Sequence, residues 1–277
     1  MSGSRAVDLL VNCYERTYRE VLTEETLRRI TSELDFPFAR RTLLVNNVDD
    51  RGDADRRAQA VIESGAADEV FHVEDHLDEA LERTGLTLAE LQPIPYFTDW
   101  AVVAVCLPGP GWMLHWDPEL RMGSDVDWIT PALELFERDP RVMVAGPHWG
   151  MPDDVQRQEV ERSGPFSLGH GFSDHVFLIR RADFARPIYR DRSLVRFRYP
   201  LAHVGHIFEA RVDAHLRRNG RLRAVHLEAG YAHPLEIGAA YPARKLSEKL
   251  RYVRNRALIR ALQLLPWRPF RVRHIGR

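Results

Sequence analysis

An acidic residue directly follows an apolar run near the middle of the chain. The run Trp112 to Trp116 ends at Asp117, and Pro118 comes next. Proline cannot donate a hydrogen bond to a neighbouring strand, so this order predicts a buried strand that stops just after the acid. In open α/β sheets, ligands bind beyond the carboxyl ends of the strands. Asp117 is therefore a candidate ligand for a metal ion or a sugar phosphate, and the alternative is an acid that only begins a turn.

The elements that would position this acid alternate between strands and helices. Apolar segments 7–13 and 42–46 predict two buried strands, and amphipathic spacing after Thr23 predicts a helix between them. The apolar segment 99–107 fits a strand or a helix, and we favour a helix because 112–115 makes the better strand. Helices of this length between strands predict an α/β fold with a doubly wound, mostly parallel sheet flanked by helices. The other expected strands are 69–73, 142–145, 176–179 and 223–227, and the other expected helices are 53–64, 76–84, 127–138, 182–189 and 206–219.

Composition excludes several classes of protein. The chain has 277 residues, of which 44% are hydrophobic and 29% are charged, so it can bury a substantial core. A formal net charge of -1 gives no whole-chain attraction to nucleic acid or to a membrane. Cys13 and Cys106 lie in apolar contexts without ligand spacing, which predicts buried free thiols in a reducing compartment. The amino terminus has no apolar signal region and no run of about 18 apolar residues occurs, so we expect a cytoplasmic protein.

Short motifs occur along the chain in a characteristic order. Residues 12–16 (Asn-Cys-Tyr-Glu-Arg) and 45–49 (Val-Asn-Asn-Val-Asp) follow the first two predicted strands. His115-Trp116-Asp117 ends a later strand, and Phe208-Glu209 opens a Leu- and Val-containing helix that stops at Gly220. This order resembles the nucleotide-sugar glycosyltransferases of the GT-A fold, especially the family 2 group. In that comparison, residues 115–117 correspond to a variant Asp-x-Asp metal motif in which only the last acid is kept.

The resemblance implies an organisation of the chain. Residues 1–240 would form a GT-A-like catalytic domain, with a nucleotide-binding half at 7–146 and an acceptor half at 147–240. Residues 147–175 are rich in Gly, Pro, Ser and His, which predicts loops over a site. Residues 241–277 would form a basic amphipathic extension.

The resemblance also implies a divalent metal ion, Mg²⁺ or Mn²⁺, which would offset the charge on a departing nucleotide diphosphate. Asp117 and His233 are the implied ligands, since the family often places a metal-binding histidine where His233 precedes Pro234. A structural turn histidine is the alternative for His233, and His226 is a rival ligand inside a predicted strand. Because His115 stands in place of the first acid, a weakly bound metal or none remains open.

An inverting transferase needs a base that deprotonates the acceptor hydroxyl, and desolvated carboxylates do this well. Glu209 is the implied base, and its alternative is a first-turn acid that complements the helix dipole. Asp213, one turn later, is the other candidate. The residues implied for acceptor binding come from the loop region and are Trp149, Phe172 and Asp174.

Nucleotide recognition is implied at the ends of the first two strands and at one helix start. Tyr14 or Cys13 would line a uracil pocket, and Arg16 would approach the diphosphate. Asp99 would contact the nucleotide from the start of a helix, and a plain helix N-cap explains this residue equally well. The full set of implied nucleotide contacts is Cys13, Tyr14, Arg16, Asn46, Asn47 and Asp99.

The carboxyl-terminal segment has its own pattern. From residue 244 to 277 it carries eleven Lys or Arg and a single acid, Glu248. Its apolar residues fall at helical spacing, so the helix could pack on the main domain or rest on an anionic membrane surface near a lipid-linked acceptor. We favour packing because 266–270 (Pro-Trp-Arg-Pro-Phe) is typical of an extension that docks. The apolar positions are Leu246, Leu250, Val253, Ala257, Ala261 and Leu264.

The predicted function is transfer of a sugar from a UDP- or GDP-type donor to the hydroxyl of a sugar, lipid-linked or small-molecule acceptor, with inversion. One alternative is a nucleotidyltransferase, against which stands the lack of a Gly-rich phosphate loop followed by Lys. The other alternative is a non-catalytic GT-A-like domain that binds a sugar or a protein partner. The missing first acid of the metal motif is the best support for that alternative. Nucleic acid is not an expected partner.

Overall fold

The computed structural model describes residues 5–149, 159–199, 201–233 and 246–264. Ten strands of these residues form one sheet. They are β1 (Val7–Tyr14), β2 (Arg40–Asn46), β3 (Glu69–His72), β4 (Trp112–Trp116), β5 (Arg121–Met122), β6 (Val142–Trp149), β7 (Glu159–Ser163), β8 (Phe166–Gly169), β9 (Val176–Arg180) and β10 (Leu222–Ala232).

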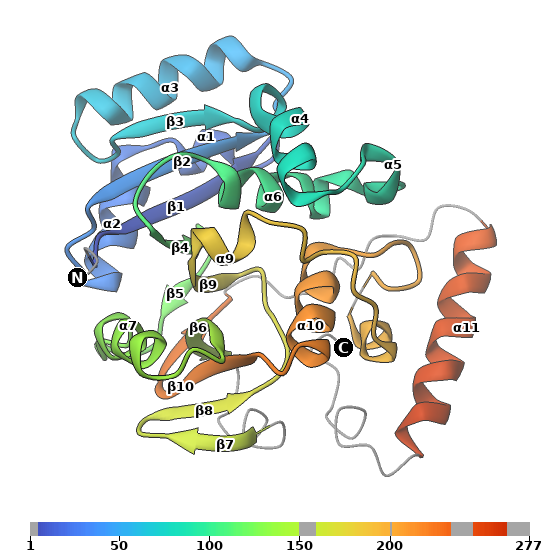
Figure 1. The fold of residues 1–277 in the computed structure, drawn as a ribbon. Coiled ribbons are helices and arrows are strands. Elements are labelled where there is room, and N and C mark those ends of the chain that lie inside the picture. Colours follow the sequence, from blue (N-terminus) through green and yellow to red (C-terminus); the bar gives the residue numbers. More distant parts are fainter. Residues whose placement is uncertain (1–4, 150–158, 200, 234–245, 265–277) are drawn as a thin grey trace.

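The strand order is β3-β2-β1-β4-β9-β6-β10-β8-β7, with β5 paired to β10 (Figure 1). Strands β3, β2, β1 and β4 are parallel, and β9 lies antiparallel between β4 and β6. Strand β10 is parallel to β6, so it points the same way as β1 and β4. Only β9, β8 and β5 run in the opposite direction among these strands. The predicted mostly parallel α/β sheet is confirmed, and one sheet spans both predicted halves.

Helices cover both faces of this sheet. One core cluster joins β1 to helices on one face, namely α1 (Tyr18–Val21), α2 (Glu24–Leu34), α3 (Arg51–Glu63) and α7 (Ile129–Arg138). A second cluster lies on the other face, with α4 (Val73–Thr84), α6 (Asp99–Cys106), α9 (Arg181–Phe184) and α10 (Phe208–Arg218). The remaining helical elements are α5 (Leu88–Leu91), α11 (Leu246–Gln263) and the 3-10 turns η1 (Pro95–Phe97) and η2 (Leu194–Arg198).

Side-chain alternation in β1 explains the two clusters. Leu9, Val11 and Cys13 point to the first face, and Leu10 points to the second. A strand buried on both faces needs apolar residues at nearly every position, which is why its sequence is a continuous apolar run. The same argument applies to α6, which is buried at every position from Asp99 to Val105 and therefore has no apolar period. The helix favoured for this segment is confirmed.

Two segments differ from the expectation. Much of 147–175 was expected to be loop, but β6 runs on to Trp149 and β7 and β8 form a hairpin whose turn contains Gly164 at φ 56°. The helix expected over 182–189 ends at Phe184, because Pro187 cannot occupy a helix interior. Among the described helices, none is long and apolar enough to cross a membrane.

Helix α11 packs on the domain, but with the opposite face from the one expected. The apolar positions Leu246, Leu250 and Val253 are exposed, whereas Asn255 and Ile259 are buried. The prediction that the apolar stripe packs on the main domain is therefore wrong. The segment 266–270, on which that prediction partly depended, lies outside the described residues.

A buried ion network joins three parts of the fold. Asp8, at the start of β1, is fully buried and accepts hydrogen bonds from Arg40 Nη2 at 2.7 Å and from Thr42 Oγ1 at 2.7 Å. Arg181 of α9 also pairs with Asp8 and donates to the carbonyl of Ala104. The carboxylate therefore compensates two guanidinium groups, one of them buried.

We expect the Asp8→Asn variant to lose about 3–5 kcal/mol of unfolding free energy, because it leaves the buried Arg181 charge without its partner. The matched control is Glu137→Gln, which breaks the exposed Arg5–Glu137 pair and should cost less than about 1 kcal/mol. Urea denaturation of both variants measures the difference. Equal stabilities of the two variants would contradict the assigned role of Asp8.

Candidate metal and nucleotide site

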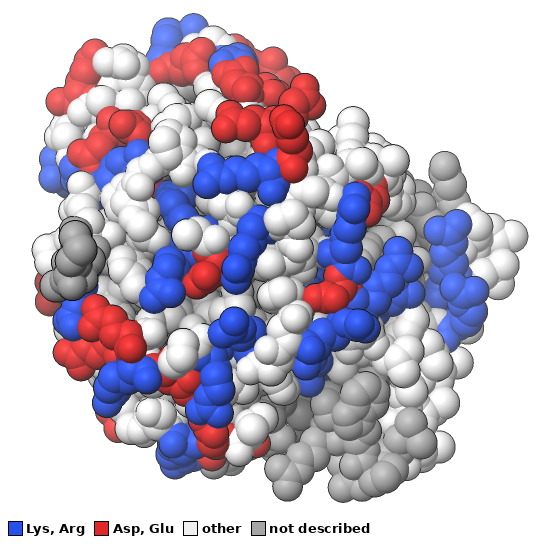
Figure 2. Space-filling view, viewed as in Figure 1, with Lys and Arg blue, Asp and Glu red and all other residues white. Residues whose placement is uncertain are grey.

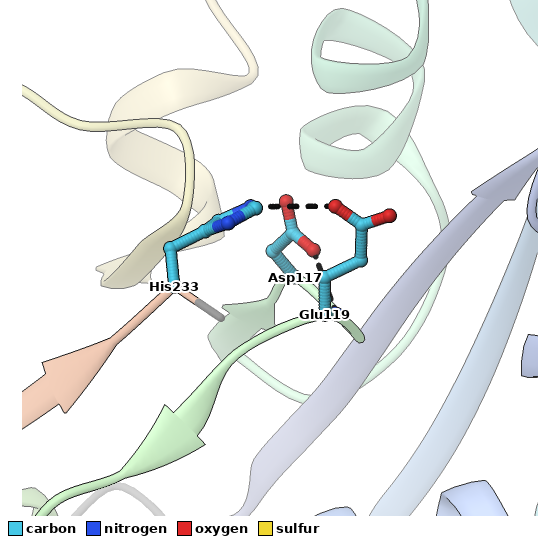
Figure 3. Close-up of side chains that lie close together, drawn as sticks. All are labelled: Asp117, Glu119 and His233. Atoms are coloured by element: carbon cyan, nitrogen blue, oxygen red, sulfur yellow. Dashed lines mark hydrogen bonds and ion pairs between the residues drawn. The ribbon is translucent and has the colours of Figure 1, made fainter. Parts of the chain in front are cut away.

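Two carboxylates and one imidazole meet beyond the carboxyl ends of β4 and β10. Asp117 and Glu119 follow β4, and His233 follows β10. One ligand atom from each lies within 4.8 Å of the others, and His233 Nε2 is 3.3 Å from Glu119 Oε2 (Figure 3). All three side chains are half-buried. This is the only such group of three metal-ligating side chains found in the described part of the chain.

The turn after β4 places both acids on the same side. The backbone N–H of Glu119 donates to Asp117 Oδ1 at 2.9 Å, which closes an Asx turn across Pro118. The N–H of Asp117 donates to the carbonyl of His175 at 2.9 Å. Arg29 Nη2 donates to the Pro118 carbonyl at 2.8 Å and fixes the turn from the α2 side. The turn is therefore held by hydrogen bonds on both sides.

His115 lies in the core and is not part of the metal-ligating cluster. Its ring is buried in the second core cluster, with ring centroids 4.5 Å from Trp100 and 5.0 Å from Phe177. Burial lowers the pKa of His115 to about 3, so the ring is neutral. The acid pair is instead Asp117-x-Glu119, two residues further along the chain than the motif 115–117. Glu119 was missed, although its two-residue spacing from Asp117 is visible in the sequence.

His175 also lies in this corner and was missed. Its ring centroid is 5.4 Å from that of His233 and 5.7 Å from that of Trp149. Its Nδ1 is buried and has no hydrogen-bond partner among the described residues. The only feature of the sequence that could have indicated His175 is its position directly before the apolar strand β9. Trp149, predicted for acceptor binding, is half-buried at this edge of the site.

The electrostatics of the corner favour a bound cation. Burial, together with the negative charge of Glu119, raises the pKa of Asp117, and His175 and His233 oppose that shift. Burial and the negative charges of Glu119 and Asp117 also raise the pKa of the Tyr14 phenol. Two carboxylates with one imidazole form a donor set suited to Mn²⁺ or Mg²⁺. The residues present therefore fit a divalent ion.

Three of the predicted nucleotide-binding residues meet at the end of β2. Asn47 has a left-handed backbone with φ 48°, and its Nδ2 donates to Asp99 Oδ2 at 3.2 Å and to Asn46 Oδ1. Asp99 Oδ1 accepts the N–H of Trp100 at 2.6 Å, so the acid also begins α6. Burial raises the pKa of Asp99. These amide and carboxyl groups therefore form one hydrogen-bonded cluster at the carboxyl end of β2.

The end of β1 supplies two more of the predicted residues and excludes a third. Tyr14 is 41% exposed, and the charge of the exposed Arg16 acts on its phenol. Within the described residues, Arg16 forms no ion pair. Cys13, however, is completely buried, and burial raises its pKa to about 12. The prediction that Cys13 lines a uracil pocket is wrong, because strand alternation turns its side chain into the core.

A second carboxylate pair lies at the start of α10. Glu209 Oε1 accepts the N–H of Asp174 at 3.3 Å. Burial raises the pKa of Glu209 well above its ordinary value, and the nearby Asp174 carboxylate adds to this, while Arg223 opposes it. The rival base Asp213 is buried, and its Oδ1 accepts the N–H of Gly171 at 2.9 Å and Arg217 Nε at 2.8 Å. Asp213 therefore holds a loop and a neighbouring side chain.

Two further predicted residues prove to be structural. Phe172 is buried against Phe177 and Phe208, with ring centroids 5.1 Å and 5.5 Å away, so the prediction that it binds an acceptor is wrong. His226 is buried, and its Nδ1 accepts the N–H of Ala229 at 3.1 Å, so it is no rival metal ligand. Both side chains stabilise the fold around the site.

The chain was compared with known proteins. No protein-family model and no curated protein sequence matches it. Glucosyl-3-phosphoglycerate synthase from Mycobacterium tuberculosis, in complex with Mn²⁺, UDP and glucosyl-3-phosphoglycerate, is 14% identical with a TM-score of 0.43, over 94% of this chain and 79% of that one. GalNAc-T7 with UDP, GalNAc and Mn²⁺ is 10% identical with a TM-score of 0.45, over 90% of this chain and 48% of that one. The galactosyltransferase LgtC with donor and acceptor sugar analogs is 13% identical with a TM-score of 0.36, over 64% of this chain and only 59% of that one. Likenesses this low transfer no residue role to this chain.

The raised pKa of Glu209 predicts how stability changes with pH. A carboxyl whose pKa is raised on folding stabilises the folded state only while it is protonated. The folded protein therefore loses stability as the pH rises from the ordinary pKa of 4.5 through the raised pKa of Glu209. Each unit of upward shift corresponds to about 1.4 kcal/mol. We therefore expect Glu209→Gln to become more stable than the wild type as pH rises from about 5 to about 8, the range in which most proteins have their maximal stability.

Urea denaturation at several pH values measures this difference in unfolding free energy. The control is Glu228→Gln, which alters an exposed carboxyl of β10 and should keep a constant offset from the wild type. A constant offset for Glu209→Gln as well would show that its carboxyl titrates normally.

Proposed function

We propose that the chain is a metal-dependent glycosyltransferase of the GT-A type that uses a nucleotide diphosphate sugar. The observation that carries this proposal is the Asp117-Glu119-His233 cluster at the same sheet edge as Tyr14 and the Asn46-Asn47 pair. Strands β2, β1, β4 and β10 all point to that edge, so one extended ligand can touch all of these groups.

Different strand ends have different tasks in this proposal. The Asn46, Asn47 and Asp99 group binds the base or ribose, and Tyr14 offers an exposed aromatic ring beside it. Arg16 adds a positive charge near the diphosphate. Asp117, Glu119 and His233 would hold Mn²⁺ or Mg²⁺, which when bound offsets the negative charge of the leaving group. The donor is of the UDP or GDP type.

Glu209 is the proposed base of a single inverting displacement. The acceptor oxygen forms a bond to the anomeric carbon while the bond from that carbon to the diphosphate oxygen breaks. The hydroxyl proton passes to the Glu209 carboxylate. Burial beside Asp174 raises the pKa of Glu209 toward the operating pH, which strengthens it as a base. Trp149 and Asp174 border the place where a sugar, lipid-linked or small-molecule acceptor would enter.

The finding on Glu119 bears on the non-catalytic alternative. That alternative depended on the absence of the first acid from the motif, whereas the cluster contains two carboxylates. No observation on the described residues favours a nucleotidyltransferase.

Nucleotide release from a panel of UDP- and GDP-sugars, with Mn²⁺ and candidate acceptors, tests the proposal. The wild type should bind one nucleotide class and turn over. We expect Glu209→Gln to lose roughly 10²–10⁴-fold in transfer rate, because the acceptor proton has no base. Its nucleotide dissociation constant, from calorimetry, should stay within about twofold, because Glu209 interacts with Asp174 and not with the nucleotide groups.

Glu228→Gln serves as the control and should retain full transfer. Undiminished transfer by Glu209→Gln would remove Glu209 from the mechanism. If the wild type binds none of the nucleotides, the proposed function itself is wrong.

A further inference from the structure

Helix α11 has two faces with opposite environments. Asn255 and Ile259 are buried, and the ring of Tyr252 packs edge-on against His203 with centroids 5.1 Å apart. These three positions share one side of the helix, since residues three and four apart are neighbours. This side therefore attaches α11 to the domain near η2.

The other side of the helix is apolar and exposed. Leu246, Leu250, Val253 and Leu264 are 74%, 63%, 63% and 87% exposed. At 100° per residue, Leu246, Leu250, Val253 and Ala257 fall within about 60° of one another, opposite Asn255 and Ile259, and Leu264 follows the end of the helix. The helix has 18 residues, so this apolar stripe is about 27 Å long. A contiguous exposed apolar surface of this kind marks a site of interaction.

Positive charges border the apolar stripe. All five cations of the helix are exposed. Within the described residues none of them forms an ion pair, although Arg256 lies over the Tyr252 ring at 5.8 Å. Figure 2 shows blue side chains along α11 at the right of the molecule, whereas red side chains gather at the other end, over α3 and α4. The cations are Lys249, Arg251, Arg254, Arg256 and Arg260.

These features fit an anionic lipid surface better than a second copy of the chain. A helix with a flat apolar stripe between rows of Lys and Arg can lie in the membrane interface, with its cations at the lipid phosphates. Pairing two copies of the same stripe would bring two sets of exposed cations together, which is unfavourable. The charge pattern is complementary to anionic headgroups.

We propose that α11 docks the protein on anionic membranes, with Leu246, Leu250, Val253 and Leu264 inserted at the level of the headgroups. The helix lies parallel to the membrane surface, and its Asn255 and Ile259 side remains attached to the domain. This inference does not depend on the proposed transferase activity. It is carried by the exposure and charge of α11 alone.

Vesicle flotation of the full chain tests this docking. The probes are vesicles of phosphatidylcholine alone and of two parts phosphatidylcholine to one part phosphatidylglycerol. We expect the wild type to float with the anionic vesicles, to remain free of the neutral ones, and to dissociate as salt rises. The double variant Leu250→Glu/Val253→Glu should lose at least tenfold in partition, and Arg254→Gln roughly fivefold.

The control is Val160→Glu, a matched substitution of a residue that is 61% exposed on β7. It should float like the wild type. The altered residues are exposed, so circular dichroism melting curves of all variants should match the wild type. Nucleotide-sugar turnover with a soluble acceptor should be unchanged in the Leu250→Glu/Val253→Glu variant, which separates this test from that of the proposed function.

Three results would overturn the proposal. The wild type could fail to float with anionic vesicles, or the double variant could float as well as the wild type. In the third result, sedimentation would show that the wild type is a dimer and the double variant a monomer, and the wild type would bind no vesicles. That result would assign the stripe to contacts between copies.

Discussion

Parallel hydrogen bonding of β1 to both β2 and β4 is the constraint on which the site depends. Parallel strands end at the same edge of a sheet, so the residues after β1, β2 and β4 become neighbours although they are far apart in sequence. The reversed strand β9 could have ended this pattern. It pairs instead with β6 on its other side, and β10 then runs parallel to β6 and delivers His233 to the same edge. The fold thus brings four separate segments together at this edge.

The site contains two pairs of carboxyl groups in different electrostatic surroundings. Asp117 and Glu119 lie beside the imidazoles of His175 and His233, which oppose the raised pKa of Asp117. Glu209 lies beside Asp174, and Arg223 opposes the raised pKa only in part. Burial raises the pKa of Asp117 and raises that of Glu209 well above its ordinary value, so the two pairs differ in the groups that surround them and not in the direction of the shift. In our account the first pair binds a cation, and Glu209 takes up a proton.

The sequence predicted the architecture well because apolar runs and helix breakers act locally. The rule that ligands bind beyond strand ends singled out Asp117, whereas the resemblance to GT-A glycosyltransferases put His233 with it and Asn47 with Asp99 in another part of the site. Which face a side chain takes was harder to predict. Cys13 and Phe172 point into the core, and α11 turns its apolar stripe outward, since neighbours distant in sequence decide these orientations. Glu119 and His175 were missed because a turn and a loop, not a periodic pattern, bring them to Asp117.

The central claim is that Asp117, Glu119 and His233 hold a divalent ion against a nucleotide diphosphate. Pulsed electron paramagnetic resonance of Mn²⁺ added to the full chain with UDP measures this directly. The account predicts ¹⁴N hyperfine coupling from the His233 ring in the wild type, beside the ³¹P coupling that Mn²⁺ bound to UDP shows even without protein. The ¹⁴N coupling should persist in the control Asp125→Asn, whose exposed acid lies outside the cluster, and vanish in Asp117→Asn/Glu119→Gln. A ¹⁴N coupling that is unchanged in the double variant, or absent from the wild type, would contradict it.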